Sequence, residues 1–484
     1  MNETIAGIAT ASGTGSISII RVSGPDAIET VDSIIFKKTT QNNTNNNLKK
    51  NILKNAGSHT IIHGYIGSKP DDIIDEVLIM LMKAPHSYTA EDVVEIQCHA
   101  GASAVREILN LLIEKKVRPA EPGEFTKRAF LNGRIDLTQA ESVMEIINAK
   151  NKLALTTAGR HLRGDIRSKI SEFRRIILDD MAYLEAALDD PEHIELRNYT
   201  DTLLSHIDPI DNEITKILNN SENGQLISEG IRTAIIGRPN VGKSSFLNMI
   251  LGDDRAIVTD IPGTTRDTIE EDIRIGSYTL HLIDTAGIHE TTDEVENIGV
   301  KKAISARDNS DFIICILDAS KPLTDDDISL IKTCKNKPHI ILLNKSDLTP
   351  VIDERSVQDA QKANDQNSIP DNKYPENLLK ISSKTGKGLD ELEKRLDSII
   401  TDTFFGKTDF TSSEPMITSL RQKEALTEVR TSIAAIRETI SSGMPEDLLT
   451  VDLLTTYNTL GSIIGETTED DLIDKIFSNF CLGK

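Results

Sequence analysis

The fold class of the central part of this chain follows from the segment Gly237-Arg238-Pro239-Asn240-Val241-Gly242-Lys243-Ser244. Its glycines let backbone N–H groups curl around phosphate groups, Lys243 can reach the terminal phosphates, and the hydroxyl of Ser244 suits Mg²⁺. The apolar run 233–236 precedes the stretch, and a helical pattern over 245–250 follows it. A strand, a glycine-rich turn and a helix in this order predict a P-loop nucleotide-binding domain.

Downstream of the P-loop, apolar segments alternate with helical patterns. The strand candidates lie at 278–283, 312–317, 339–343 and 378–382. This alternation predicts an α/β domain with a doubly wound sheet, in which ligands bind at the carboxyl ends of the strands. The polar run 358–376 is interpreted as a surface insertion in that domain.

Two motifs after the P-loop suit the phosphates of a nucleotide. The segment Pro262-Gly263-Thr264-Thr265-Arg266-Asp267 supplies a switch loop, where a Thr can complete Mg²⁺ coordination when the γ-phosphate is present. Asp284-Thr285-Ala286-Gly287 ends a strand, which places Asp284 near the metal and Gly287 near the γ-phosphate. The predicted Mg²⁺ ligands are Ser244 and Thr265.

Two further motifs select the base. Asn344-Lys345-Ser346-Asp347 follows an apolar strand, and the carboxylate of Asp347 can accept hydrogen bonds from the guanine N1–H and N2 amine. Adenine lacks this donor pair, so the motif favours GTP over ATP. The segment Ser382-Ser383-Lys384 can close over the base. The central region is therefore predicted to be a GTP-hydrolysing switch domain.

The residue that orients the attacking water is left open by these motifs. Small GTPases use a Gln after DxxG for this purpose, but Ile288 follows Gly287 here and cannot do so. The polar candidates close by are His289, Glu290, Glu294 and Glu296.

Outside the switch domain the sequence shows other secondary-structure patterns. Residues 1–125 contain strand-like alternation at 16–22 and 93–98, with an Asn-rich loop at 41–47. Residues 126–229 and 406–484 are helical; Ala140, Val143, Met144 and Ile147 recur at helix spacing and are expected in the core, as are Phe173, Ile176, Ile177, Met181 and Leu184. We therefore predict a multidomain α/β and α protein. Its N-terminal α+β domain covers 1–125, and its helical domain is split into 126–229 and 406–484 by a GTPase domain inserted at 230–405.

Composition limits the function classes. The formal charge of −22 argues against broad nonspecific nucleic-acid binding, which needs many Lys and Arg side chains. Four scattered cysteines without a CxxC pattern fit reduced thiols in the cytoplasm. No stretch is apolar and long enough to span a membrane, and the first residues do not resemble a signal peptide.

Four segments together resemble one known family, the tRNA modification GTPases called MnmE or TrmE. They are residues 87–96, 122–132, the switch at 261–267 and the C-terminal segment 477–484, which ends in Phe-Cys-Leu-Gly-Lys. The resemblance covers nearly the whole chain and implies the same insertion of a GTPase domain into a helical one. It also implies the full GTP-binding set, namely Asn240, Val241, Gly242, Lys243, Ser244, Ser245, Thr259, Asp260, Ile261, Pro262, Gly263, Thr264, Thr265, Asp284, Thr285, Ala286, Gly287, Asn344, Lys345, Asp347, Ser382, Ser383 and Lys384.

The resemblance further implies cofactors. A tetrahydrofolate derivative carrying a one-carbon unit would bind at Arg21, Glu95, Arg134 and Lys484. Arg and Lys can pair with the carboxylates of folate, and a carboxylate can bind the amino-pyrimidine edge of the pterin. A K⁺ ion would be held by Asn240, Thr259, Ile261 and Thr264 and would offset developing phosphate charge. Among the four open candidates the resemblance selects Glu296 as the catalytic, water-orienting residue.

The family acts as a homodimer with a flavoprotein partner, MnmG, and together they install an aminomethyl-type group on C5 of the wobble uridine of certain tRNAs. Three departures stand out: the first loop reads Ala11-Ser12-Gly13-Thr14-Gly15, His289 stands where the family often has Arg, and both polar inserts are extra. The role of Cys481 is undecided between structural and catalytic. The alternative function is a regulatory or ribosome-assembly GTPase without modification chemistry, although such factors lack the folate-type domain and the C-terminal motif.

Overall fold

The computed structural model describes residues 3–11, 15–37, 51–190, 192–193, 199–252, 271–283, 307–334, 337–352, 354–362, 377–406, 415–468, 470–478, 480 and 483–484. The chain divides into two compact units. The first unit comprises Met1–Met144, His161–Leu196 and Glu438–Lys484, and the second comprises Glu145–Arg160 and Arg197–Arg437. Within the described part of the chain, no helix is both long and apolar enough to cross a membrane.

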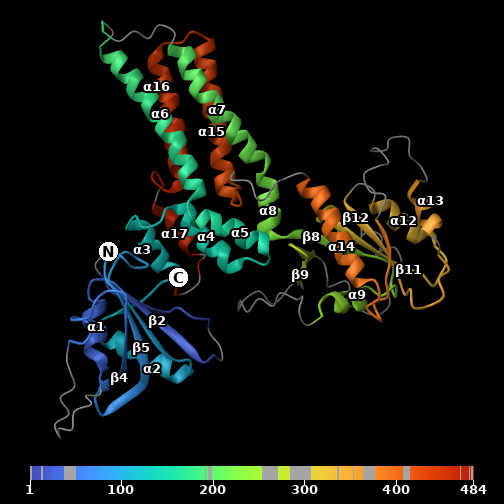
Figure 1. The fold of residues 1–484 in the computed structure, drawn as a ribbon. Coiled ribbons are helices and arrows are strands. Elements are labelled where there is room, and N and C mark those ends of the chain that lie inside the picture. Colours follow the sequence, from blue (N-terminus) through green and yellow to red (C-terminus); the bar gives the residue numbers. More distant parts are fainter. Residues whose placement is uncertain are drawn as a thin grey trace. The chain divides into compact units, whose positions relative to one another are not determined.

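A seven-stranded sheet forms the N-terminal part of the first unit (blue in Figure 1). Its order is β3-β4-β5-β6-β2-β1-β7, and its pairs are antiparallel except for the parallel pair β1–β7. The apolar faces of helices α1 (Ala27–Ile34) and α2 (Ala102–Glu114) pack with the inward side chains of the sheet in one core. The strands are β1 Ile5–Ile8, β2 Ile17–Ser23, β3 Ile35–Phe36, β4 Thr60–Lys69, β5 Asp72–Met82, β6 Val93–His99 and β7 Arg118–Pro119.

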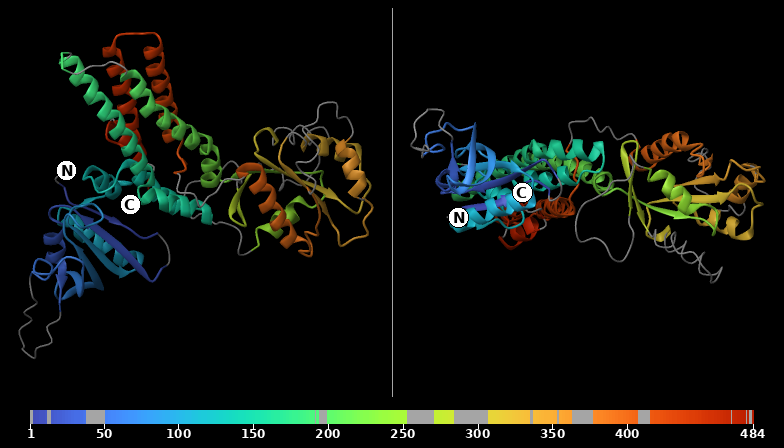
Figure 2. Two further views of the ribbon diagram at one scale, coloured as in Figure 1. Left: turned by 45° about the horizontal axis from the view of Figure 1, so that its top comes forward. Right: turned by 90° about the horizontal axis from the view of Figure 1, so that it is seen from below.

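Helices complete the first unit. The long helices α6 and α16 lie along one another (Figures 1 and 2), and the Arg174 guanidinium of α6 lies over the Tyr457 ring of α16 at 4.1 Å. A small core of Ala129, Leu137 and Phe477 joins α3, α4 and α17. The bounds are α3 Glu124–Leu131, α4 Leu137–Asn148, α6 Asp165–Asp189, α16 Glu446–Ile464 and α17 Asp470–Ser478.

Five of the nine predicted helical core positions are confirmed as buried, Ala140 among them, whereas Val143, Met144 and Ile176 are half-buried. Phe173, Ile177, Met181 and Leu184 are buried along one face of α6. Ile147 of α4 is a correction, because its side chain is 42% exposed. Ile147 lies in the last turn of α4. The apolar periodicity of the helix extends to this turn, but no core side chain among the described residues covers Ile147 there.

The second unit contains a six-stranded sheet of order β13-β12-β11-β8-β10-β9. Helices α9 and α14 share the core on one face of this sheet, and α12 and α13 share the core on the other, so the predicted doubly wound α/β architecture is confirmed. Strand β9 was not predicted; it pairs antiparallel with β10 and makes the sheet mixed. The bounds are β8 Ile231–Ile236, β9 Glu271–Ile275, β10 Tyr278–Ile283, β11 Phe312–Asp318, β12 His339–Asn344, β13 Leu378–Lys380, α9 Lys243–Ile250, α12 Asp325–Cys334, α13 Glu354–Lys362 and α14 Leu389–Ile400.

The second unit also contains helices that precede and follow the six-stranded sheet in the sequence. The buried Asn151 side chain precedes α5 and donates to the Ile227 carbonyl and to Thr279 Oγ1, both at 3.1 Å, which ties α5 to α8 and to β10. Arg437 Nη1 of α15 pairs with Asp211 Oδ2 of α7 at 2.7 Å. The bounds are α5 Lys152–Leu162, α7 Tyr199–Asn219, α8 Ser221–Glu229, a π-helical turn η1 Thr401–Phe405, and α15 Leu420–Ser441.

The structure describes only part of the two polar inserts predicted from the sequence. The Asn-rich run 41–47 and residues 363–376 lie outside the described residues. The start of the second run, at residue 358, continues helix α13 instead of beginning a separate insertion.

Candidate functional site

The P-loop leaves the end of β8 and enters α9 in backbone conformations that phosphate binding needs. Asn240 and Gly242 have φ values of +64° and +100°, in the left-handed region. The Nζ of Lys243 donates to the carbonyls of Gly237 and Arg238, both at 2.8 Å, so its ammonium lies inside the loop. Burial lowers the pKa of Lys243, and an anion bound beside it would reverse that shift.

Asn344, at the end of β12, links the P-loop to the two predicted base-recognition segments, 344–347 and 382–384. Its Nδ2 donates to the Val241 carbonyl at 2.8 Å, and its Oδ1 accepts from the backbone N and the Oγ of Ser383 at 2.9 and 3.0 Å. A Cβ on Gly242 would lie 2.3 Å from this Nδ2, so only glycine fits there. The buried amide therefore holds three predicted motifs at fixed separations.

Asp347 offers its carboxylate to a ligand. The buried Ser382 donates from Oγ to Asp347 Oδ1 at 2.7 Å, and this bond holds the pKa of the fully exposed Asp347 below its usual value. The carboxylate is thus ionised, oriented and open to solvent. Such an acceptor suits the two adjacent donors of guanine.

The structure brings together twelve of the predicted GTP-binding residues at the carboxyl edge of the sheet. They are Asn240, Val241, Gly242, Lys243, Ser244, Ser245, Asn344, Lys345, Asp347, Ser382, Ser383 and Lys384. The other predicted positions lie outside the described residues. These are Thr259, Asp260, Ile261, Pro262, Gly263, Thr264, Thr265, Asp284, Thr285, Ala286, Gly287 and the water-orienting candidate Glu296.

A second cluster lies on the sheet of the first unit. Arg21 on β2 and Glu95 on β6 are register partners, and Arg21 Nε donates to Glu95 Oε1 at 2.8 Å. Both side chains are 13% exposed. The Arg21 and Arg134 guanidinium groups contact the Tyr88 ring, at 4.7 and 4.8 Å from its centroid. Three of the predicted folate-binding side chains therefore gather around one tyrosine.

The C-terminus reaches the same cluster. The Phe125 backbone N donates to the Lys484 carbonyl at 3.2 Å, and Arg21 Nη1 lies 3.5 Å from the Gly483 carbonyl. Gly483 has φ +87°, and a Cβ there would lie 1.9 Å from the Ile8 carbonyl oxygen. Gly483 thus permits a close approach of the C-terminal segment to β1. Cys481 lies outside the described residues.

Three residues of these sites were missed at the sequence level. Tyr88 and Phe125 lie within motifs that drew attention, but nothing in their spacing marks them as partners of Arg21, whose guanidinium also lies 5.5 Å from the Phe125 ring centroid. Asp318 Oδ2 accepts from Lys345 Nζ at 2.7 Å, but Asp318 belongs to no motif, and its position at the end of the buried strand β11 is its one sequence signal.

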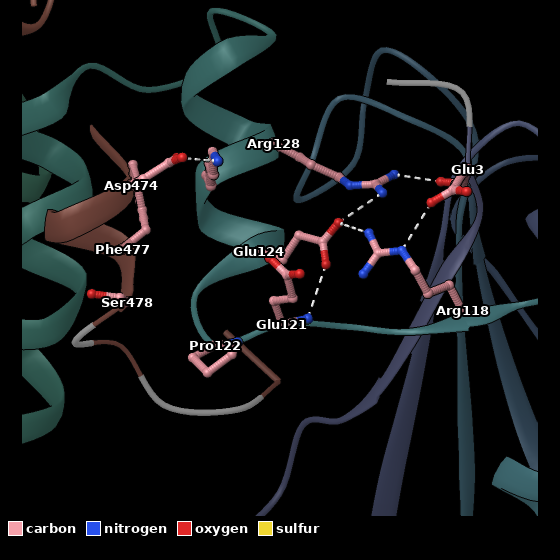
Figure 3. A pocket seen from close by; sticks show the side chains of 10 residues that line it. Glu3, Arg118, Glu121, Pro122, Glu124, Arg128, Asp474, Phe477 and Ser478 are labelled. Carbon is pink, nitrogen blue, oxygen red and sulfur yellow. Dashed lines mark hydrogen bonds and ion pairs between the residues drawn. The ribbon is translucent and has the colours of Figure 1, made fainter. Parts of the chain in front are cut away.

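A cavity of about 610 Å³ lies near α3 and α17 in the first unit (Figure 3). Its polar wall is an ion-pair network in which Glu124 Oε1 accepts from Arg118 Nη2 at 2.5 Å and from Arg128 Nη2 at 2.9 Å. Burial would raise the pKa of Glu124, but the hydrogen bonds, with that from Arg118 the largest, keep it below its usual value. Arg128 also donates to the Glu3 carbonyl at 2.9 Å, so the network ties α3 to the N-terminal segment.

Comparison with known proteins assigns both parts of the chain to one family. The model for the GTP-binding protein TrmE N-terminus matches residues 4–134, and the model for the MnmE helical domain matches residues 137–481. A tRNA modification GTPase MnmE from Lachnoclostridium phytofermentans is 45% identical over 482 residues, covering 100% of this chain and 99% of the relative. The protein of the same name from Clostridioides difficile is 42% identical, with 100% of both chains covered.

Among solved structures, the crystal structure of Aquifex aeolicus Era bound to GDP and AlF4⁻ aligns with 27% identity and a TM-score of 0.25. It covers 42% of this chain and 66% of that chain, a likeness too low to support an inference.

Proposed function

This chain belongs to the MnmE family of tRNA modification GTPases, and from this we propose that it hydrolyses GTP in the modification of tRNA. The hydrogen bonds at the sheet edge support GTP as the substrate, because Asn344 joins the P-loop to Ser383 and Ser382 orients the Asp347 carboxylate. The Lys243 ammonium lies inside the P-loop, which supports a role for it in binding the terminal phosphates. GTP is therefore the proposed substrate of the second unit.

We propose Mg²⁺ and K⁺ as the ions of this site. Ser244 is the second residue of α9 and offers the hydroxyl that Mg²⁺ takes in P-loops, with Thr265 as the second proposed ligand. The side chain of Asn240 carries an amide oxygen, a group able to coordinate K⁺, and this residue lies in the P-loop beside the proposed phosphate site. Both ions would offset negative charge that develops on the phosphates.

Replacing K⁺ by Na⁺ should therefore lower GTP turnover by about 100-fold, the order of effect of removing one stabilising group from a developing oxyanion. Steady-state phosphate release in matched KCl and NaCl checks this. The Asn240→Ala variant should be slow in both salts. Equal turnover of the unaltered protein in the two salts would refute the assignment of Asn240.

We propose the first unit as the site of a tetrahydrofolate derivative. The donor set fits this ligand, because Arg21 and Arg134 can pair with carboxylates while Glu95 can accept hydrogen bonds from an amino-pyrimidine edge. The Tyr88 ring lies within cation–π distance of both guanidinium groups and can hold them in place for the ligand. When bound, the folate would supply the one-carbon unit. The chain's residues would bind and orient it, and Lys484 is a further proposed ligand.

Replacing Arg21 by Ala should weaken folate binding by about 10-fold or more, because a charge-assisted hydrogen bond is lost and Glu95 is left without its partner. Calorimetry with 5-formyltetrahydrofolate measures the dissociation constant. The matched control is Arg106→Ala, which removes an exposed arginine on α2, away from this cluster. If both variants bind folate like the unaltered protein, the site is elsewhere.

The remaining proposals concern assembly and product. We propose a cytoplasmic homodimer that acts with the flavoprotein MnmG on C5 of the wobble uridine, adding a carboxymethylaminomethyl-type group. We also propose the domain bounds 1–125, 126–229, 230–405 and 406–484; the helix-to-strand junction between α8 and β8 supports the start of the inserted domain. The Arg21–Glu95 cluster favours this function over a ribosome-assembly GTPase, which has no use for a folate site.

A further inference from the structure

A carboxylate outside every GTPase motif lies beside the P-loop. Asp318 is the last residue of β11, and its register partner is Asn344, the last residue of β12. Parallel strands end at one edge of a sheet, so Asp318 lies at the edge where the nucleotide is proposed to bind. Its side chain is only 8% exposed.

Both oxygens of this carboxylate are fixed. Oδ1 accepts from the backbone N and the Oγ of Ser320 at 3.0 and 2.6 Å, and Oδ2 accepts from Lys345 Nζ at 2.7 Å. Burial by itself raises the pKa of Asp318, but the hydrogen bonds, with that from Lys345 the largest, hold it below the usual value. Asp318 is therefore ionised and oriented at neutral pH.

Lys345 is the group that Asp318 orients. The same Nζ donates to the Asn240 carbonyl in the P-loop at 2.8 Å, and the Lys345 backbone is left-handed with φ +64°. An ammonium has three donors, of which Asp318 and Asn240 take two. The long Lys345 side chain is thus ordered against the P-loop before a ligand binds. Ligand binding therefore does not have to supply the entropy cost of ordering it.

We propose that Asp318 is a positioning residue for the nucleotide, acting through Lys345. Its carboxylate holds the ammonium against the Asn240 carbonyl, which braces the P-loop against the guanine-recognition loop. Asp318 then sets nucleotide affinity and leaves the chemical step unchanged. The inference rests on the proposed GTP site and names a residue outside its motifs.

The test is Asp318→Asn in the full-length protein. The amide keeps the size of the side chain and an acceptor for Ser320, but it loses the charge that holds Lys345. We expect the dissociation constant of a fluorescent GDP analogue to rise about 10-fold, with kcat at saturating GTP within about 2-fold of the unaltered protein. Asp318→Glu keeps the charge but moves it by one methylene, and it should recover part of the affinity.

The matched control is Asp311→Asn. Asp311 accepts from Arg232 Nη2 at 2.8 Å and from Arg232 Nε at 3.0 Å just before β11 begins, at the opposite edge of the same sheet. This variant removes an ion pair of the same domain and should leave nucleotide affinity within about 2-fold. In a Lys345→Met background, Asp318→Asn should add little further loss, since its effect passes through Lys345.

Two failures are distinguishable. If the unaltered protein does not bind the GDP analogue, the proposed GTP site itself is wrong. If the unaltered protein binds it and folded Asp318→Asn and Asp318→Glu bind it equally well, Asp318 does not position the nucleotide. A full additional loss in the Lys345→Met background would also overturn the inference.

Discussion

Replacing Asp347 by Asn is expected to lower kcat/KM for GTP by about 1,000-fold and to create hydrolysis of xanthosine triphosphate. The guanine edge presents two donors to the carboxylate, and hydrogen bonds to a charged partner are stronger than those between neutral groups. Asn keeps the oxygen that accepts from Ser382 Oγ but replaces the other acceptor by a donor. Xanthine has a carbonyl where guanine has its amine, so its edge matches the amide.

Phosphate release with both nucleotides measures this switch. Asp311→Asn serves again as the control, because it makes the same chemical change at the far edge of the sheet and should keep the preference for GTP. A variant at Asp347 that still prefers GTP over xanthosine triphosphate would show that another group recognises the base.

Replacing Glu296 by Ala is expected to lower GTP hydrolysis by about 1,000-fold, within the range of a positioned general base, while GTP and GDP bind as before. Glu296 lies outside the described residues, so this expectation rests on the family resemblance and on Ile288, which cannot orient water. Single-turnover hydrolysis and nucleotide binding separate the two effects. Glu290→Ala and Glu294→Ala are the matched controls and should retain turnover. Retained turnover in Glu296→Ala would move the role to Glu290 or Glu294.

The architecture of the second unit could be predicted from local patterns, because a P-loop, buried strands and helical periodicity all point to one answer. Strand β9 could not, since its residues Glu271–Ile275 are largely polar and become a strand through pairing with β10. Ile147 shows the opposite error: helical periodicity marks a face, but whether another element covers that face is decided by the tertiary structure.

In the candidate sites too, some residues could be predicted from the sequence and others could not. Motifs named Asn344 and Asp347, but the contact of Asn344 with Val241 spans 103 positions and has no sequence signal. The Arg21–Glu95 pair became visible only once the register of β2 and β6 was known. The role of Gly483 needed the distance to the Ile8 carbonyl. Residue types and spacing identify chemistry, whereas long-range partners come from the fold.

Mass spectrometry of tRNA nucleosides shows directly whether this GTPase serves tRNA modification. Deleting the gene should remove the C5 aminomethyl-type group from wobble uridines, and the unaltered gene should restore it while Glu296→Ala should not. Wobble uridines that keep their modification after the deletion would show that this GTPase does not act in their modification.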